Sequence, residues 1–559
     1  MGAVALGLCA CNSDEVPNSN KGGEEINSET YLSFSIAMPN DGTRAAAGNV
    51  SDANEGDTYI GTEEEQKVTD IRVVLYNEHS IVAYSFDFTE NSQHGDGTKF
   101  IKSKSGSYYT TDAIKVKNQS YDALVLINPL DEVKNVTEPG MILEKFADQA
   151  VEISEDKLVT KKGIFMSNAK GLSTVPETAI KNTKKEAEDN PFKDGSNGIK
   201  VDRAVAKVFV GKSTTLSTSD NATVTLKGWT LDITNKKLFW MRKFDKYAAM
   251  KNTFYEEEKT TREERFQRYA KDPNFSNGIE RNENEFNYIT EIVNDVENRS
   301  TRFGVAEVSR VRMSIDPSEV VKKDFGFGDN NGLYLLENTM QADRQYQPVT
   351  TRVIVQAEYI PNQLFKESDE VQDKSWYDFD GIPIRADYLQ KLYNNDAHEP
   401  SLDPDEHQMI ANELEDILGR DRLDLLINII EYFETETGNK FNQDLGPDGQ
   451  SYIMYYDDSH KLSFYKNAIC YYPIRIRHFS DDLSDKTNYQ YAKTTPDHDG
   501  YGRYGVVRNN IYKLTINSVK KPGLPIIDYP NEKDDNDSYY LAIQSHMMPW
   551  LVRTQEVDL

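Results

Sequence analysis

Residues 30–38 read TYLSFSIAM, and this alternation decides the fold class of the chain. Large apolar side chains alternate with smaller or more polar ones, which is typical of a half-buried β-strand. The predicted inward face carries four apolar residues: Leu32, Phe34, Ile36 and Met38. The predicted outward face carries the residues between them: Tyr31, Ser33, Ser35 and Ala37. Burial of the inward face is expected to contribute about 6–12 kcal/mol.

Further strands follow, so the chain is predicted to be mainly β. Their ranges are 68–76, 80–88, 114–116, 121–127, 164–168, 201–210, 224–235, 237–240, 350–359, 468–477 and 506–516. We expect strands 68–76 and 80–88 to be neighbours, and strands 224–235 and 237–240 to pair. Residues 143–153 are predicted to form one helix. Residues 403–438 are predicted to form a helical insertion, with Asp403 as cap and Pro404 in the first turn.

The first residues look like a processing segment. Residues 1–10 read MGAVALGLCA, an apolar run too short to span a bilayer, and Cys11 follows it directly. Leu8 and Ala10 stand at the −3 and −1 positions of a bacterial lipobox, so Cys11 is the predicted lipidated residue. No basic segment precedes the apolar run, so the position of the native N-terminus is left open. The alternative is a short buried apolar end. A polar tether, residues 12–29, follows.

A flexible loop, residues 39–49, follows the first strand and reads PNDGTRAAAGN. It presents a single basic residue, Arg44, among small ones, and exposed loops of this kind are preferred sites of proteolysis. The loop is therefore a predicted cleavage site.

The last stretch, residues 539–559, reads YYLAIQSHMMPWLVRTQEVDL and is unusually apolar for a terminus. It is predicted to form two short strands broken at Pro549. A polar tether, residues 531–537, precedes it. A tethered strand needs a sheet edge to pair with, either in its own chain or in a neighbour.

The composition excludes several functions. The chain has 559 residues and a formal net charge of −28, which disfavours non-specific binding to nucleic acid or to an anionic membrane. Beyond the leader the only cysteine is Cys470, inside an apolar strand, so no internal disulfide can form and a buried thiol is expected.

No motif points to catalysis, a metal or a cofactor. The triplet Asp497–Asp499 contains a histidine between two acids, but an exposed loop is favoured over a metal site. Residues 500–505 match G-x-G-x-x-G, yet they precede a strand rather than open a helix, so a dinucleotide site is disfavoured. The chain is therefore predicted not to be an enzyme, with no cofactor.

Together these features resemble a known family, the Mfa1-type major fimbrial subunits (fimbrillins) of Bacteroidales, in the FimA-like superfamily. The carriers of the resemblance are the lipobox, residues 43–45, 71–76, 121–129, 165–167, 201–210 and 227–229, the run RNNIYKL at residues 508–514, and the closing Pro549-Trp550. The last two are the most specific.

The resemblance implies two transthyretin-like β-sandwich domains, at residues 45–212 and 213–530, with the helical insertion in the second. It implies a lipoprotein signal at residues 1–11, a palmitate-bearing Cys11 in the outer membrane, and a propeptide at residues 12–44. An Arg-directed surface protease would cut between Arg44 and Ala45 and remove the first strand.

The resemblance further implies that residues 531–559 of the next copy fill the vacated groove. The predicted donor residues are Tyr540, Leu541, Ile543, Trp550, Leu551 and Val552. Repetition of this head-to-tail contact gives a surface fimbria that supports adhesion to host or bacterial ligands. Accessory, tip and anchor fimbrial proteins are the other implied partners.

Two alternatives remain at this level. A surface glycan-binding lipoprotein would stay anchored through Cys11 and keep residues 12–44, and an accessory or tip pilin would accept a strand without donating one. A secreted glycan-active enzyme is disfavoured, because no catalytic constellation stands out.

Overall fold

The structure is a computed structural model of the whole chain. The residues that it describes are 29–38, 46–47, 58–59, 61–90, 99–102, 108–195, 198–243, 271–275, 278–290, 292–294, 310–314, 326–327, 332–340, 344–365, 373–393, 404–437, 451–456, 459–476, 504–534 and 551–558. Strands dominate, so the prediction of a mainly β fold is confirmed. Among the described helices, none is long and apolar enough to cross a bilayer.

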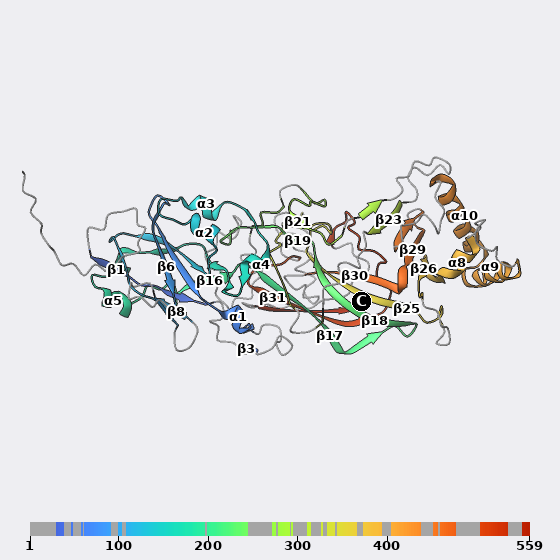
Figure 1. Cartoon of the computed structure of the whole chain (residues 1–559), viewed down its shortest axis with the longest axis horizontal. Coiled ribbons are helices and arrows are strands. Elements are labelled where there is room, and N and C mark those ends of the chain that lie inside the picture. The colour runs from blue at the N-terminus through green and yellow to red at the C-terminus, as the bar shows by residue number, and fades with distance from the viewer. Residues whose placement is uncertain are drawn as a thin grey trace, which may run out of the picture. The chain divides into compact units, whose positions relative to one another are not determined.

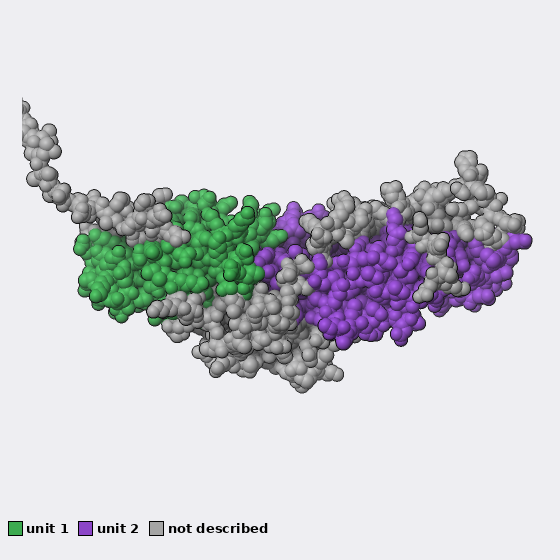
Figure 2. Space-filling view, turned by 60° about the horizontal axis from the view of Figure 1, so that its bottom comes forward, with its two compact units in different colours: residues 1–45, 60–204, 238–259 green, residues 46–59, 205–237, 260–559 purple. Residues whose placement is uncertain are grey.

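The chain forms two compact units that interleave in sequence (Figure 2). Unit 1 comprises residues 1–45, 60–204 and 238–259, and unit 2 comprises residues 46–59, 205–237 and 260–559. The division into domains at 45–212 and 213–530 stays a prediction.

Unit 1 is built on one large sheet and contains two separate short strand pairs (Figure 1). The strand order of the sheet is β6 (Val82–Thr89), β5 (Asp70–Tyr76), β10 (Tyr121–Ile127), β14 (Met166–Asn168), β16 (Ile199–Arg203), β2 (Ser35–Ala37), β8 (Tyr108–Thr111) and β7 (Phe100–Lys102). β15 (Ser173–Val175) also pairs with β10. Separate pairs are β1 (Thr30–Leu32) with β9 (Ile114–Val116) and β12 (Val159–Thr160) with β13 (Gly163–Ile164).

Unit 1 also contains several short helices. They are α1 (Glu63–Gln66), α2 (Asp131–Asn135), α3 (Leu143–Ala147), α4 (Glu155–Leu158), α5 (Lys184–Asp189) and the 3₁₀ turn η1 (Glu177–Ala179). The predicted helix over residues 143–153 is wrong: α3 ends at Ala147, and a short strand, β11 (Val151–Glu152), follows. The predicted neighbours at residues 68–76 and 80–88 are confirmed as the antiparallel pair β5 and β6.

Unit 2 contains two sheets that share one hydrophobic core. The first has the order β24 (Leu333–Leu335), β17 (Ala206–Thr218), β31 (Asn510–Val519), β32 (Leu551–Asp558), β4 (Thr58–Tyr59) and β3 (Ala46–Ala47). The second has the order β18 (Ala222–Asp232), β25 (Arg352–Pro361) and β30 (Ile469–Arg475). Val208, Leu514, Trp229, Val355 and Ile474 meet in the core, which gives a sandwich.

Two predicted strands are placed differently by the structure. Residues 201–210 are not one strand, because Ala204 and Val205 lie outside regular structure and separate β16 from β17. The predicted pairing of residues 224–235 with 237–240 is also wrong, because β18 pairs along its length with β25. Ile233 has φ +58° and ends β18, after which β19 (Thr234–Asn235) pairs with β21 (Phe286–Asn287). β20 (Lys237–Leu238) follows.

The helical insertion has a core of its own. Its sheet has the order β22 (Ile292–Asn294), β23 (Arg310–Ser314), β28 (Tyr452–Tyr455), β29 (Lys461–Tyr465), β26 (Trp376–Phe379) and β27 (Ile382–Arg385). Its helices and its strands β26 to β29 come between β25 and β30, which pair directly with each other, whereas its strands β22 and β23 precede β25 in the chain. Helices α8 (Ala386–Tyr393), α9 (Pro404–Leu418) and α10 (Arg420–Thr437) pack against it through Leu389, Leu414 and Leu426 (Figure 1). Gly419, with φ +78°, separates α9 from α10, and the 3₁₀ turn η4 (Lys466–Ala468) leads into β30.

Candidate functional site

The second half of the predicted first strand lies in the interior of the large unit 1 sheet rather than at an edge. Residues 30–38 form two pieces, β1 and β2, separated at Ser33 and Phe34. β1 pairs with β9. β2 lies between β16, to which it is parallel, and β8, to which it is antiparallel. Removal of β2 would therefore leave a slot with a hydrogen-bonding strand on either side.

Both faces of this segment are buried from Leu32 onward, while Tyr31 on the predicted outward face is half-buried, so the predicted half-buried strand is corrected over most of its length. Leu32, Phe34, Ile36 and Met38 are 1%, 0%, 0% and 8% exposed, as expected of the inward face. On the face predicted to point outward, Ser33, Ser35 and Ala37 are only 1%, 0% and 1% exposed. The period-two pattern therefore separates large from small side chains here, not inside from outside.

Hydrogen bonds satisfy the buried polar groups of the segment. Ser33 Oγ donates to the Thr111 carbonyl at 2.7 Å, and the Phe34 amide donates to Thr111 Oγ1 at 3.0 Å. The Thr111 amide donates back to the Phe34 carbonyl at 3.0 Å, and the Ser35 amide donates to the Phe192 carbonyl at 2.9 Å. The rings of Phe34 and Phe192 meet edge to face, with centroids 6.1 Å apart. Departure of the segment would leave these partners without their bonds.

Gly198 lets the neighbouring backbone approach the segment closely. It precedes β16 and has φ +138°, a conformation that L-residues rarely adopt. A Cβ at this position would lie 2.2 Å from the Ser35 carbonyl oxygen and 2.9 Å from the Ile36 amide nitrogen. Any other residue here would push β2 away from β16.

Burial also perturbs a tyrosine beside the segment. Tyr109 lies on β8 directly opposite Ile36 and is 4% exposed. Burial, with a smaller contribution from the nearby Glu90, raises the pKa of its phenol to about 12. Tyr109 is thus a buried neighbour of β2 in the folded unit.

The end of the chain pairs with its own unit. β32 runs parallel to β31 from the Asn510–Leu551 pair to the Ser518–Asp558 pair, with one irregularity after Ile516. On its other side β32 pairs with β4 at a single position, Leu551 opposite Thr58. Of the predicted donor residues, Leu551 and Val552 lie in β32, and Tyr540, Leu541, Ile543 and Trp550 lie outside the described residues.

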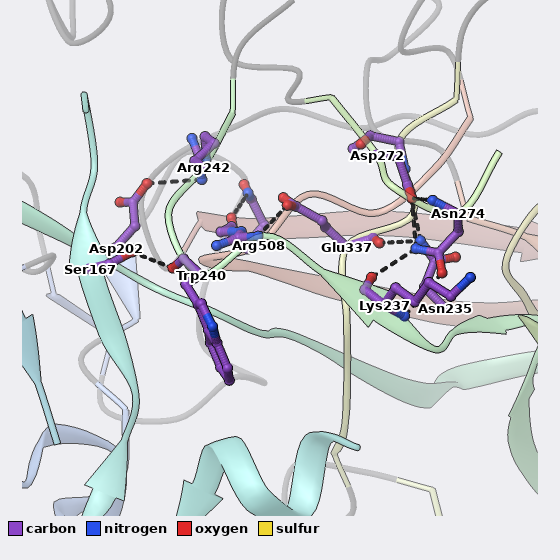
Figure 3. A network of polar contacts seen from close by, with 12 residues as sticks. Ser167, Asp202, Asn235, Lys237, Trp240, Arg242, Asp272, Asn274, Glu337 and Arg508 are labelled. Atoms are coloured by element: carbon purple, nitrogen blue, oxygen red, sulfur yellow. Dashed lines mark hydrogen bonds and ion pairs between the residues drawn. The ribbon is translucent and has the colours of Figure 1, made fainter. Parts of the chain in front are cut away.

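The motif RNNIYKL builds the strand that receives β32. Arg508 is 1% exposed and forms an ion pair with the equally buried Glu337 (Figure 3). Asn509 has φ +62°, and its amide donates to the Val205 carbonyl at 2.8 Å. Tyr512 belongs to the sandwich core, and its hydroxyl accepts from the Val507 amide at 2.8 Å. The motif is thus a structural start for β31.

A second buried network lies nearby in unit 2. Asp272 accepts hydrogen bonds from the Thr339 amide at 2.8 Å and from the side chains of Asn274 and Asn235 at 2.7 and 2.6 Å (Figure 3). Burial raises the pKa of its carboxyl to about 7, although these donors act in the opposite direction. In unit 1, Arg242 and Asp202 form a comparable buried pair at 2.9 Å. These networks fix loops onto the sheets.

The predicted tether begins later than Asn531. Asp534 is 1% exposed, and its carboxylate faces Arg475 Nε at 3.0 Å and accepts from Thr350 Oγ1. Its amide donates to the Gln345 carbonyl at 3.1 Å. Unit 2 therefore holds the chain at Asp534, and residues 535–550 lie outside the described range.

The structure brings together only part of the predicted site. Cys11, Arg44 and Ala45 lie outside the described residues, as do Asp497–Asp499. Cys470 is fully buried, and burial raises the pKa of its thiol to about 12. In the described part of the chain, no cluster of histidine, cysteine and acidic residues could hold a metal ion.

Sequence reasoning missed Thr111, Gly198 and Asp534. Gly198 follows Asn197, a dipeptide that signals only a turn, and Asp534 lies in an acidic run that suggests a solvated surface. Their partners are remote in sequence, so no local pattern could identify them.

Comparison with known proteins follows this geometry. Residues 463–556, which contain β30, β31 and most of β32, match the family model described as "Major fimbrial subunit protein type IV, Fimbrillin, C-terminal". No curated protein matches the chain.

Several solved structures share a low similarity with the chain. A candidate cell adhesion protein from Parabacteroides distasonis is 11% identical, with a TM-score of 0.37, over 95% of this chain and 98% of its own. The tip fimbrial protein Mfa3 from Porphyromonas gingivalis, truncated at its C-terminus, is 10% identical, with a TM-score of 0.29, over 61% and 83%. These scores are too low to support an argument about fold or function. The match over residues 463–556 confirms that the chain resembles the fimbrillins, as its RNNIYKL motif predicts.

Proposed function

We propose that the chain is a non-catalytic structural subunit of a surface fimbria, which polymerises by exchange of its first strand for the tail of another copy. The observation that carries the proposal is the position of β2, an internal strand that belongs to a segment joined to the rest of the chain by the loop with Arg44. A removable internal strand leaves a slot that only another strand can fill.

The physical argument has two parts. The four large apolar side chains from Leu32 to Met38 contribute about 6–12 kcal/mol when buried, and an incoming strand would recover a similar free energy. The backbone groups of β16 and β8 that bind β2 would also need new partners, because an unpaired buried group costs about 1–3 kcal/mol. A slot of this kind recruits a strand by β-augmentation.

The tail provides the proposed replacement. Unit 2 buries Asp534, and 25 residues follow it (559 − 534), the last of which form β32 and would have to leave β31 to reach another copy. Fully extended, they could reach about 80 Å. The donor comes from residues 539–559 of the next copy, with Tyr540, Leu541, Ile543, Trp550, Leu551 and Val552 as candidate anchors. The likeness to the fimbrillin C-terminal region supports this role.

Maturation would begin at the membrane. Export as an outer-membrane lipoprotein through Cys11, followed by cleavage between Arg44 and Ala45 by an Arg-directed surface protease, would release both the lipid and the first strand. The mature subunit would then join other copies, together with accessory, tip and anchor proteins, in an adhesive fimbria.

Substitution of Arg44 tests the proposal. Arg44→Ala should leave a lipidated, uncleaved chain that folds but forms no filaments on cells, as seen by electron microscopy. Lys21→Ala, which removes a basic residue from the same N-terminal stretch, is the matched control and should assemble normally. Normal filaments from Arg44→Ala would contradict the proposed trigger.

A further inference from the structure

Three exposed lysines gather at one turn of unit 1, although the whole chain carries a formal net charge of −28. Lys161 and Lys162 are the two loop residues of the hairpin β12–β13, in which Thr160 pairs with Gly163. Lys67 follows α1, and its ammonium group donates a hydrogen bond to the Lys161 carbonyl at 2.9 Å. The turn therefore presents three positive charges close together.

The backbone holds this lysine cluster in place. Gly163 has φ +112°, and a Cβ at this position would lie 2.1 Å from the Lys67 carbonyl oxygen. Asn128 is 8% exposed, and its side-chain amide donates to the Lys67 carbonyl at 2.9 Å and to the Ile164 carbonyl at 3.1 Å. The backbone that carries Lys67 is therefore fixed to the hairpin.

The cluster lacks a counter-charge of its own. Within the residues that the structure describes, no acidic side chain forms an ion pair with Lys67, Lys161 or Lys162. α1 contacts β13 and carries Glu63 and Glu64, which are exposed and do not pair with these lysines either. Like charges repel, and solvent ions alone screen them here. An anionic ligand would relieve this repulsion.

The other described pairs of adjacent lysines are arranged differently. In the pair at residues 184–185, Lys184 forms an ion pair with Glu188. In the pairs at residues 236–237 and 520–521, Lys236 and Lys520 each donate to an oxygen atom of the chain. The turn at residues 161–162 differs from them, because a third ammonium group joins it.

The chemistry of the cluster indicates what kind of ligand it fits. None of the large apolar residues that are exposed in the described chain belongs to α1, β12 or β13. Protein partners are usually held by aromatic or arginine anchors, and the cluster has neither. Lysine ammonium groups are compact, strongly hydrated point charges, which suit single carboxylate or sulfate groups along a hydrated polymer. An anionic polysaccharide is therefore favoured over an acidic protein.

We propose that Lys67, Lys161 and Lys162 bind the carboxylate or sulfate groups of an anionic polysaccharide. Of the proposed function, this inference uses only the adhesive part, to which it gives a class of ligand, and it does not depend on strand exchange. The net charge of the chain opposes long-range attraction of a polyanion, so the binding is local. It is also sensitive to salt, because the charges are exposed.

Retention of the purified full-length chain on immobilised dextran sulfate and on immobilised polygalacturonate tests the site. Lys161→Gln with Lys162→Gln should lower the affinity at least about tenfold, because two of three contacting charges are lost. Lys161→Arg with Lys162→Arg keeps both charges and should bind like the unchanged chain. Salt at about 1 M should release the chain, since the screening length falls to about 3 Å.

Two other lysine pairs provide matched controls. Lys184→Gln with Lys185→Gln should leave binding unchanged, and so should Lys520→Gln with Lys521→Gln. All the variants change exposed residues, so their melting temperatures should match that of the unchanged chain. Absence of binding by the unchanged chain, equal binding to neutral dextran, or a loss of binding in a control pair alone would overturn the site.

Electron microscopy of cells that carry Lys161→Gln with Lys162→Gln separates this inference from the proposed function. Normal filaments with weakened polysaccharide binding support the site. Missing filaments with unchanged polysaccharide binding would mean that the lysines contact another copy, and would overturn it. If Arg44→Ala assembles normally while the lysine variant loses polysaccharide binding, the proposed trigger fails and the site stands.

Discussion

β2 and β32 are both paired in parallel with a strand of their own unit, yet they differ in what surrounds them. β2 has a neighbour on each side and lies in a segment whose two faces are both buried. β32 is paired along its length with β31 alone and touches β4 at one position. A strand with a full ladder on each side is costly to remove and leaves a specific slot, whereas a strand with a full ladder on one side only can detach at the cost of that ladder and one further pair. In the proposed function this difference explains why removal of the first strand needs covalent cleavage.

The largest expected effect is a loss of stability when core packing in the first strand is removed. Phe34→Ala in the uncleaved chain should lower the free energy of unfolding of unit 1 by about 3–5 kcal/mol, because a fully buried ring is lost. Ile101→Ala, on β7 at the outer edge of the same sheet, changes a side chain that is 61% exposed and should alter stability by less than about 1 kcal/mol. Chemical denaturation of both variants measures the difference in the free energy of unfolding. Equal losses would contradict the tight packing of Phe34 in the interior of unit 1.

The anchor of the tail gives the next effect. Asp534→Asn should cost about 3 kcal/mol, because Arg475 loses its charged partner in a buried environment. Glu532→Gln, at an exposed position of the same acidic run, is the matched control and should be close to neutral. Urea unfolding followed by hydrogen exchange in residues 344–350 reports the loss, and unchanged protection there would show that Asp534 anchors nothing.

Substitution of two glycines tests how closely each one's backbone approaches the neighbouring strand. Gly198→Ala should destabilise unit 1 by about 2–3 kcal/mol, through a strained φ and a clash with Ser35. Gly211→Ala, on β17 where it faces β31, meets only the Leu514 carbonyl oxygen at 3.9 Å and should be nearly neutral. Similar melting temperatures for the two variants would contradict the close approach of β16 to β2.

The smallest effect is spectroscopic. In the uncleaved chain the phenol of Tyr109 should ionise near pH 12, because burial raises its pKa. Cleavage after residue 44 should expose it and move that pKa toward the ordinary value of about 10. Difference ultraviolet titration against Tyr109→Phe isolates this group, and an unchanged titration after cleavage would mean that β2 does not cover it.

Local patterns predicted individual strands better than their partners. Residues 121–127 and 350–359 carry enough β-branched and apolar residues to fix strands, and the structure places β10 and β25 there within a few residues. The pairing of β18 with β25 and of β2 with β16 depends on contacts between segments far apart in sequence, which no local period contains.

Burial was harder to predict where small polar residues are involved. Ser33 and Ser35 have the composition of an outward face, yet both are buried inside the unit, where Ser33 Oγ donates to the Thr111 carbonyl and the Ser35 backbone amide donates to the Phe192 carbonyl. From the sequence, Asp534 is likewise predicted to be part of a solvated tether. In the structure it is buried and contacts Arg475 and Thr350. In both cases a partner that is remote in sequence allows a polar residue to be buried.

The central claim is that the first strand is removed before the subunit assembles. Mass spectrometry of the N-terminal peptide of the protein taken from the cell surface tests it most directly. The account predicts a chain that begins at Ala45 and lacks residues 30–38. A surface protein that retains those residues, with a lipid on Cys11, would contradict it and support an anchored binding protein instead.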